Sequence, residues 1–305
     1  MTTTANPDTA PAPDQTDPQQ HREHHHRSSG RPMRIRRVSM LHGWYWLIEG
    51  FALWLRNPAF LSFLTFGCFL AAFAAALVPY VGELLCMILY PSLTLGVYNG
   101  CRAIDRRRQL RPELLLSGFR RRVYDMLLAG FCNFAVIKLV LLGTIQIDDG
   151  VLWKLLENSE VSDTLTLSSP GFLYALLAVA ILLIPWGIAF LFVSQLVGWW
   201  RLPVSRALSS SFVGCLRNLL PLLVYSFCFL FFACMLPALV INFINLTMEG
   251  LGTLACAIYV LLIVPVLLAS FYVAARDIFG LPRRRKHRRR SEQQAQELQE
   301  TEPNE

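Results

Sequence analysis

Long apolar segments separated by short polar ones make up most of the chain. The first apolar stretch, residues 43–78, would be about 54 Å long as one helix, well beyond a hydrocarbon core of about 30 Å. It is interrupted at Pro58, because proline disfavours helix in the residue before it and the nearby Arg56 is costly in lipid. The pattern therefore predicts a short helix over 43–55 and a first membrane span over 58–78.

Five further apolar segments are each long enough to cross a membrane. They lie at residues 81–100, 124–145, 172–197, 219–243 and 251–275. Two more short segments place apolar residues at helical spacing beside a polar face; these residues are Leu115, Phe119 and Val123, then Val204, Leu208, Phe212 and Leu216. The chain is therefore predicted to be all-α, a polytopic membrane helical bundle with six transmembrane helices.

Every second span has a proline near its middle: Pro91, Pro185 and Pro265. Aligning the first and last spans on these prolines also matches Tyr98 with Tyr272. Each odd-numbered span follows a short helix. The pattern predicts three parallel hairpin repeats, each preceded by a short interfacial amphipathic helix and related by an axis along the membrane normal. The alternative is coincidence, since proline is frequent in transmembrane helices.

Each of these prolines is predicted to kink its helix and to leave a backbone carbonyl without its usual donor. Three kinked helices around one axis could separate and enclose a central cavity. They could instead pack tightly through small residues such as Gly96 and Ala269. Tight packing is the expectation here.

The composition supports a membrane location, with 54% hydrophobic residues, 16% charged residues and a mean hydropathy of +0.43 over 305 residues. The net charge of +7 comes from arginines in short blocks beside apolar runs, which argues against a nucleic-acid-binding domain. If the N-terminus is cytoplasmic, 26 of the 28 basic residues fall inside. The positive-inside rule then predicts a multi-pass protein of the bacterial inner membrane with both termini cytoplasmic.

The two ends of the chain are polar. Residues 1–37 are predicted to be a disordered N-terminal tail, without a signal peptide and without a fixed metal site in its histidine cluster. Residues 38–280 form the predicted transmembrane domain, and residues 281–305 a cytoplasmic tail that is first basic and then acidic and Gln-rich. The basic run 283–290 is expected to contact anionic lipid headgroups, with a protein partner as a further candidate and nucleic acid not expected.

No motif for phosphate, metal or nucleophilic chemistry is present, so we predict no catalytic, cofactor-binding or metal-binding residues and no enzyme activity. The eight cysteines are expected to be small core residues. Glu83 and Lys138 lie at similar predicted depths and are a candidate buried polar pair. Alternatively, Lys138 extends to the outer surface and Glu83 is solvated there. Asn133 and Asn242 are expected to form hydrogen bonds between helices.

The passages GWYWLIEGFALWLRNPAFL and YPSLTLGVYNGCRAIDRRRQLRPELLLSGFRRR, with the last proline-containing span, resemble an uncharacterised family of integral inner-membrane proteins from beta-proteobacteria and related bacteria. The resemblance covers roughly residues 38–280. It implies a six-helix membrane protein and brings no established activity, substrate or catalytic residues. More distantly, the pattern resembles the membrane domains attached to some glycerophosphodiester phosphodiesterases, but no such catalytic domain is present.

Two functions remain for the chain. The first is a non-enzymatic scaffold or envelope-homeostasis factor that acts through its basic faces and tails. The alternative is a transporter or channel for a small or lipid-like solute. The first is expected, because the spans carry so few polar groups.

Overall fold

The computed structural model describes residues 33–120, 122–158, 170–247 and 250–281, and in these residues every regular element is a helix. The part from Ile35 onward forms one compact unit. In the described residues six helical segments are long and apolar enough to cross a membrane, and each overlaps a predicted span: Pro58–Ala76, Gly82–Asp105, Val123–Asp148, Pro170–Trp200, Leu219–Leu246 and Leu251–Phe279. The prediction of an all-α, polytopic membrane helical bundle is confirmed.

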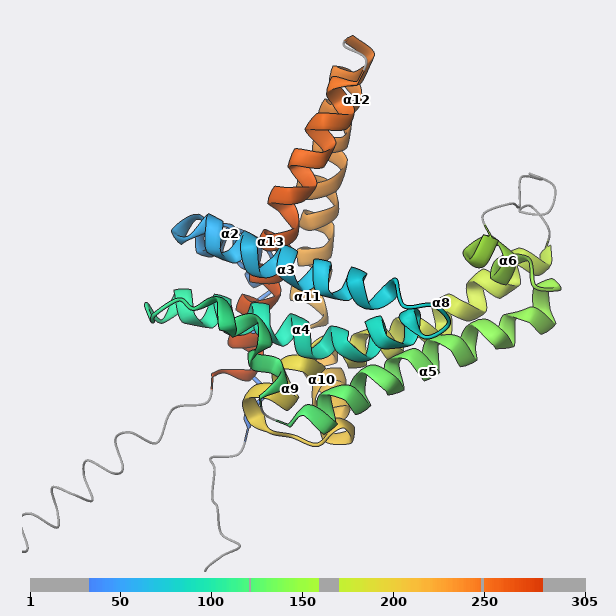
Figure 1. Cartoon of the computed structure of the whole chain (residues 1–305), viewed down its shortest axis with the longest axis horizontal. Coiled ribbons are helices and arrows are strands. Elements are labelled where there is room, and N and C mark those ends of the chain that lie inside the picture. The colour runs from blue at the N-terminus through green and yellow to red at the C-terminus, as the bar shows by residue number, and fades with distance from the viewer. Residues whose placement is uncertain (1–32, 121, 159–169, 248–249, 282–305) are drawn as a thin grey trace, which may run out of the picture. The chain divides into compact units, whose positions relative to one another are not determined.

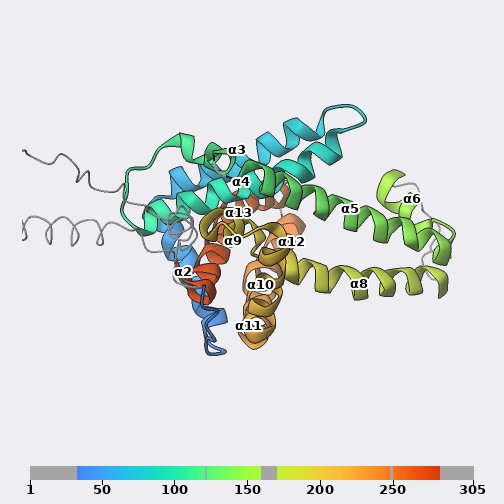
Figure 2. The same ribbon diagram turned by 90° about the horizontal axis from the view of Figure 1, so that it is seen from below.

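The spans pair into three hairpins (Figure 1). Helix α3 (Pro58–Ala76) packs against α4 (Gly82–Asp105), and α5 (Val123–Asp148) packs against α8 (Pro170–Phe190). Figure 2 shows α5 and α8 side by side from a second direction. The third hairpin joins α12 (Leu236–Thr247) to α13 (Leu251–Phe279). The hairpin order along the chain is the predicted one.

Three short helices occupy the places predicted for amphipathic helices. They are α2 (His42–Arg56), the 3₁₀ helix η1 (Pro112–Phe119) and α10 (Val204–Arg217). Helix α2 packs on α13 and on α11 (Leu219–Cys228), η1 packs on α4 and α3, and α10 packs on α8. Thus η1 and α10 each pack on the hairpin that precedes them in the chain, and α2, which comes first, packs on the third hairpin. This order supports a threefold relation, but the internal repeat stays a prediction.

A small residue in each short helix touches the proline-containing helix of the hairpin beneath it. A Cβ on Gly50 would lie 2.7 Å from the backbone of Ser270, and a Cβ on Gly118 would collide with the carbonyl oxygen of Ser92. Ser211 in α10 bonds to the backbone of the α8 hairpin. Close backbone contact requires small side chains. These three positions therefore allow each short helix to pack closely on its hairpin.

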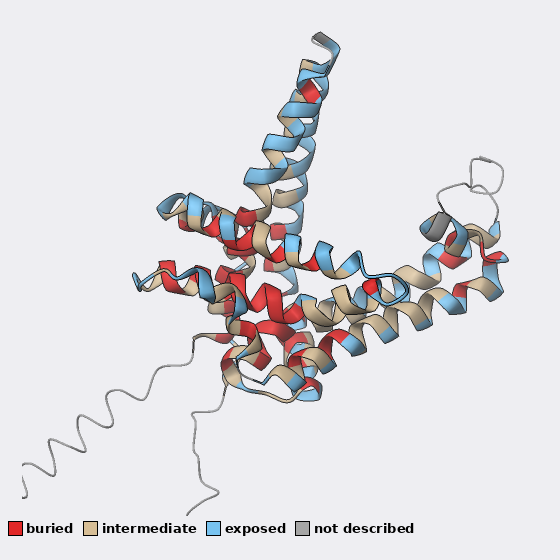
Figure 3. Cartoon of the chain, viewed as in Figure 1, coloured by how far each residue is buried: buried red, intermediate tan, exposed pale blue. Residues whose placement is uncertain are grey.

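The residues that are buried within the protein concentrate where α4, α9 (Val193–Trp200) and α13 meet (Figure 3). More than half of the apolar window in α4, 56%, is buried, against 6% for the span over α11 and α12. Aromatic rings in this core contact each other edge to face. The ring centroids of Trp199 and Tyr272 are 5.8 Å apart. The remaining apolar surface faces outward, as expected for a protein whose solvent is hydrocarbon.

The fourth span is broken between α8 and α9, and a side chain from α10 bridges the break. The Phe192 amide donates to the Ser211 hydroxyl at 3.2 Å, and that hydroxyl donates to the carbonyl of Ile188 at 3.3 Å. In an uninterrupted helix Phe192 would bond to Ile188 directly. Ser211, fully buried, is therefore inserted into the helical hydrogen-bond ladder.

The fifth span contains a π-helical segment, η2 (Phe229–Met235), that the sequence did not predict. Pro237 follows it closely, and a proline cannot donate to the carbonyl four residues earlier, here Ala233. The Tyr259 hydroxyl on α13 donates to that carbonyl instead. Because no water is available inside a membrane, this bond between helices satisfies a group that would otherwise be costly.

The segment between the predicted spans 124–145 and 172–197 is partly helical. Helix α5 continues to Asp148, and α6 (Val151–Asn158) follows two residues later. The Asp148 carboxylate accepts from the amides of Gly150 and Leu152 at 3.0 and 2.7 Å, which caps the new helix. The rest of that segment, residues 159–169, lies outside the described residues.

The predicted tails fall mainly outside the described residues, which exclude 1–32 and 282–305 and with them the histidine cluster and the basic run 283–290. A described segment just before the first helix is held by backbone bonds. The Arg36 amide donates to the carbonyl of Ile278 at 2.9 Å. The buried Asn218 side chain accepts from the Val38 amide and donates to the Arg36 carbonyl, each at 2.9 Å.

We predict that Ser211→Ala destabilises the protein, because the Phe192 amide loses its acceptor, while the Ile188 carbonyl keeps only the weak donor Cys215. Leaving buried polar groups unsatisfied costs about 1–3 kcal/mol. A thermal unfolding scan of the purified protein should show a lower Tm. Ser209→Ala is the matched control, because the Ser209 hydroxyl lies exposed on the same helix and bonds only to its own turn. Equal melting of the two variants would contradict the bridging role.

Candidate functional site

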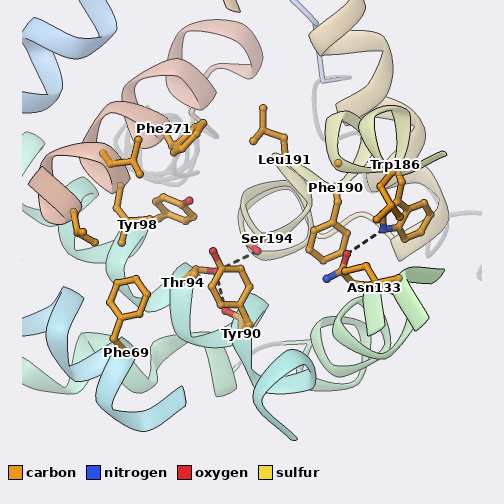
Figure 4. A pocket seen from close by; sticks show the side chains of 16 residues that line it. Phe69, Tyr90, Thr94, Tyr98, Asn133, Trp186, Phe190, Leu191, Ser194 and Phe271 are labelled. Carbon is orange, nitrogen blue, oxygen red and sulfur yellow. Dashed lines mark hydrogen bonds between the residues drawn. The ribbon is translucent and has the colours of Figure 1, made fainter. Parts of the chain in front are cut away.

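A cavity of about 360 Å³ lies between the three hairpins at the level of the prolines. Its lining residues come from α3, α4, α5, α8, α9, α13 and the break after α8 (Figure 4). Tyr90, Trp186 and Val264 in the lining are each adjacent to one of the three prolines. The expectation of tight packing is therefore wrong for this part of the bundle, although Pro91 and Pro265 are themselves buried.

Four polar side chains in the lining are paired across helices. The Trp186 indole donates to the Asn133 carbonyl oxygen at 3.0 Å, which joins α8 to α5. The hydroxyls of Thr94 and Ser194 lie 3.4 Å apart and join α4 to α9. The prediction that Asn133 bonds between helices is confirmed, whereas Asn242 lies exposed on α12. None of the sixteen lining residues is charged.

The cavity is closed at the end where α4, α9 and α13 converge. Val97, Leu196 and Tyr272, which lie within two residues of lining residues on these helices, are fully buried. Together with Phe192 they form a packed layer without charged groups. The described bundle therefore has no open polar path from the cavity to this end.

Beyond that layer lies an ionic cluster made of Glu49, Asp105, Arg276 and Asp277. The Arg276 guanidinium is 2.6 Å from Glu49, 3.1 Å from Asp277 and 3.6 Å from Asp105. Neutral donors complete it, with Tyr272 donating to Asp105 at 2.9 Å and Trp46 to Asp277 at 3.1 Å. The cluster ties α2, α4 and α13 together at one end of the bundle. Arg56, 3.9 Å from Asp105, adds a second cation, so each of the three carboxylates faces an arginine, which indicates a structural role.

The structure brings the candidate pair Glu83 and Lys138 into contact, with 2.7 Å between the Lys138 ammonium and a Glu83 carboxylate oxygen. Lys138 also lies 5.1 Å from the ring centre of Trp153 on α6. The Glu83 side chain is 58% exposed and that of Lys138 27% exposed, so the pair is not buried within the protein. A role for the pair in transport stays a prediction.

The three predicted kink positions lie inside their helices, Pro91 in α4, Pro185 in α8 and Pro265 in α13. Pro91 leaves the carbonyl of Met87 without its helical donor. The backbone of α5 comes close to it, since a Cβ on Gly130 would lie 2.6 Å from the Met87 oxygen. A glycine at that position lets the neighbouring helix cover the exposed carbonyl.

The cysteines carry no reactive site in the described residues. All eight are free thiols, and no group of three His, Cys, Asp or Glu residues could hold a metal ion there. Burial raises the pKa of the Cys215 thiol to about 12, so it stays protonated at neutral pH. Cys68, Cys101 and Cys215 are buried as expected of core residues, whereas Cys234 and Cys256 lie exposed.

The chain is 31% identical over 261 residues to a Burkholderia thailandensis protein named as a probable inner membrane protein, a match that covers 82% of this chain and 95% of that protein. The chain belongs to this family of inner membrane proteins. No family model and no solved structure matches the chain. The more distant resemblance to membrane domains of glycerophosphodiester phosphodiesterases gains no support from these comparisons.

Sequence reasoning did not predict Tyr90, Thr94, Trp186 and Ser194 as cavity residues. Three of them lie within three residues of a predicted kink, Tyr90 and Thr94 around Pro91 and Trp186 beside Pro185. Polar and aromatic side chains next to a mid-span proline are therefore the signal that could have found them. Ser194 carries no such signal, since it depends on the break after α8.

We predict that Arg276→Met destabilises the bundle, because three carboxylates lose their shared cation. Hydrogen bonds to charged groups contribute about 1.5–3 kcal/mol each when partly buried, and only part of that is expected at a site with 24% of the side chain exposed. Thermal unfolding should show a clear drop in Tm. Arg206→Met, at an exposed arginine of α10, is the control and should change Tm little.

Proposed function

We propose that this protein is a non-enzymatic inner-membrane protein that binds a small, lipid-like molecule in the cavity at the three prolines. The observation that carries the proposal is an uncharged, largely apolar cavity placed between membrane-spanning helices. Ligand sites are typically concave and mainly apolar, with a few placed polar groups. The pairs Asn133–Trp186 and Thr94–Ser194 match that description.

The size and chemistry of the cavity favour an apolar chain over an ion or a sugar. Its volume of about 360 Å³ lies at the lower end of ligand pockets, which run from about 300 to 1,000 Å³. An ion would lack a counter-charge there. The occupant supported best is therefore one hydrocarbon chain or a compact hydrophobic molecule.

Transport is a narrower form of this proposal. A channel needs a continuous polar path, whereas the layer around Val97 and Tyr272 closes the cavity at one end. A carrier would have to open that layer. If Glu83 and Lys138 form part of a transport path, Glu83→Ala or Lys138→Ala should abolish uptake or efflux, and binding in the cavity should persist.

A scaffold function is the second candidate, and exposed arginines favour it. Arg107, Arg108 and Arg111 are exposed next to the end of α4 where the buried core lies. Such residues attract anionic lipid headgroups at a membrane surface. A scaffold should tolerate Glu83→Ala and Lys138→Ala, and should lose protein partners when the basic run 283–290 is neutralised.

We propose that both termini and the ionic cluster lie on the cytoplasmic side, with the three short helices at that surface. The basic residues concentrate on this side of the six spans. Reporter fusions test the orientation. A cytoplasm-specific reporter joined after Leu281 should be active, and the same reporter joined after Pro79, in the turn between α3 and α4, should be inactive. The opposite pattern would overturn the orientation.

We predict that Gly187→Phe blocks binding in the cavity. Gly187 lines the cavity and is exposed, so it lies at the open side of the cavity. A Cβ there would meet no atom within 4 Å, so a phenyl ring can occupy this opening without a backbone collision. Labelling of the purified protein by a photoactivatable alkyl chain, mapped by mass spectrometry to the lining residues, should fall to background.

The matched control is Gly143→Phe. A Cβ on Gly143 also meets nothing within 4 Å, but this glycine lies on α5 away from the cavity. Cavity labelling in this variant should equal that of the unchanged protein. Undiminished labelling in Gly187→Phe would argue against the cavity as the binding site.

A further inference from the structure

We propose that the cavity selects an uncharged molecule with an acceptor oxygen beside its apolar chain, as in an acyl ester, and that Asn133 is the residue that selects it. This inference rests on the proposed binding function and names the chemical class of the ligand. It follows from the hydrogen-bonding capacity of the cavity wall.

The orientation of the Asn133 amide is fixed by chemistry. The Trp186 indole N–H can only donate, so the Asn133 atom at 3.0 Å from it must be the oxygen. The NH₂ group of the same amide therefore points to the other side, away from Trp186 (Figure 4). Asn133 thus offers two donor hydrogens at the cavity wall.

The neighbouring lining residues leave these donors without a good protein acceptor. Ile137, Leu183 and Phe190 in the lining are apolar, and no hydrogen bond from the Asn133 NH₂ group is seen in the described residues. A polar group in apolar surroundings is costly unless it is hydrogen-bonded. An occupant with a carbonyl oxygen supplies the missing acceptor, whereas a plain hydrocarbon leaves the amide unsatisfied.

The other polar groups of the lining do not select in this way. The Thr94 hydroxyl already donates to the carbonyl of Tyr90 at 2.9 Å, next to the hydroxyl of Ser194. The tyrosine hydroxyls of Tyr90 and Tyr98 can both donate and accept, so they suit many ligands. The Asn133 NH₂ group can only donate and therefore favours an acceptor.

The negative charge of the corresponding carboxylate disfavours its binding in this uncharged cavity. A carboxylate or phosphate in the cavity would face sixteen uncharged side chains. Burying an unpaired charge costs far more than one hydrogen bond returns. An ester keeps the acceptor carbonyl without the charge, which is why we name an uncharged ester rather than a fatty acid.

The test compares two photoactivatable probes of equal chain length, a fatty acid methyl ester and the corresponding hydrocarbon. Both are applied to the purified full-length protein in detergent micelles without ester groups. One neutral hydrogen bond predicts an ester preference of about fivefold for the unchanged protein. Asn133→Leu should bind the two probes equally. The ratio of labelling is the readout, so a loss of stability in the variant does not mimic the result.

Asn242→Leu is the matched control, because it replaces an exposed asparagine on α12 with the same apolar side chain. It should keep the ester preference. Equal labelling of both probes in the unchanged protein, or a preserved preference in Asn133→Leu, would overturn the role of Asn133 and leave the binding function standing. Failure of both probes to label the cavity would overturn the binding function itself.

A competition experiment identifies the source of the ester. Unlabelled diacylglycerol should displace the ester probe, and phosphatidylglycerol with the same chains should displace it at least about fivefold less well. Equal displacement by the two lipids would overturn the requirement for an uncharged ligand.

Discussion

Backbone hydrogen bonding without water is the constraint on which this structure depends. A proline inside a membrane-spanning helix frees a carbonyl, and lipid offers no donor for it. The chain solves this locally in different ways. Tyr259 donates to the carbonyl freed by Pro237. At the break after α8, where the ladder is interrupted without a proline, Ser211 bridges the Phe192 amide and the Ile188 carbonyl. Each solution comes from a different helix, so the kinks and the helix packing determine each other.

The same constraint places the cavity next to the core. The cavity lies beside the three prolines, and the next turns of α4 and α13 are buried within the protein. On the converging side the buried rings of Phe192 and Tyr272 fill the space, and the ionic cluster around Arg276 fixes the ends of α2, α4 and α13. At the prolines, space remains. The cavity lies at the level of the three prolines, and the buried residues beside it close one of its ends.

The contacts of the predicted site residues could be anticipated from the sequence to different extents, for a physical reason. Glu83 and Lys138 lie on successive spans at similar depth, and their contact follows from the hairpin arrangement. Asn133 needs a partner because a lone amide in an apolar span is costly, but its partner Trp186 could not be identified from spacing alone. The sequence also suggested tight packing through small residues such as Gly96 and Ala269. Both are buried, and Gly96 closely approaches the backbone of η1, but a cavity lies beside the prolines.

By itself the sequence determined the class and the plan of the protein. Apolar length and proline spacing fixed six spans, three short helices and the level of the kinks, because these depend on the thickness of a bilayer and on local backbone chemistry. Only the tertiary structure decided that a cavity lies at the level of the prolines, that Ser211 completes another helix, and which donors face inward. Those outcomes depend on contacts between residues distant along the chain, such as Asn133 with Trp186, and no local pattern encodes them.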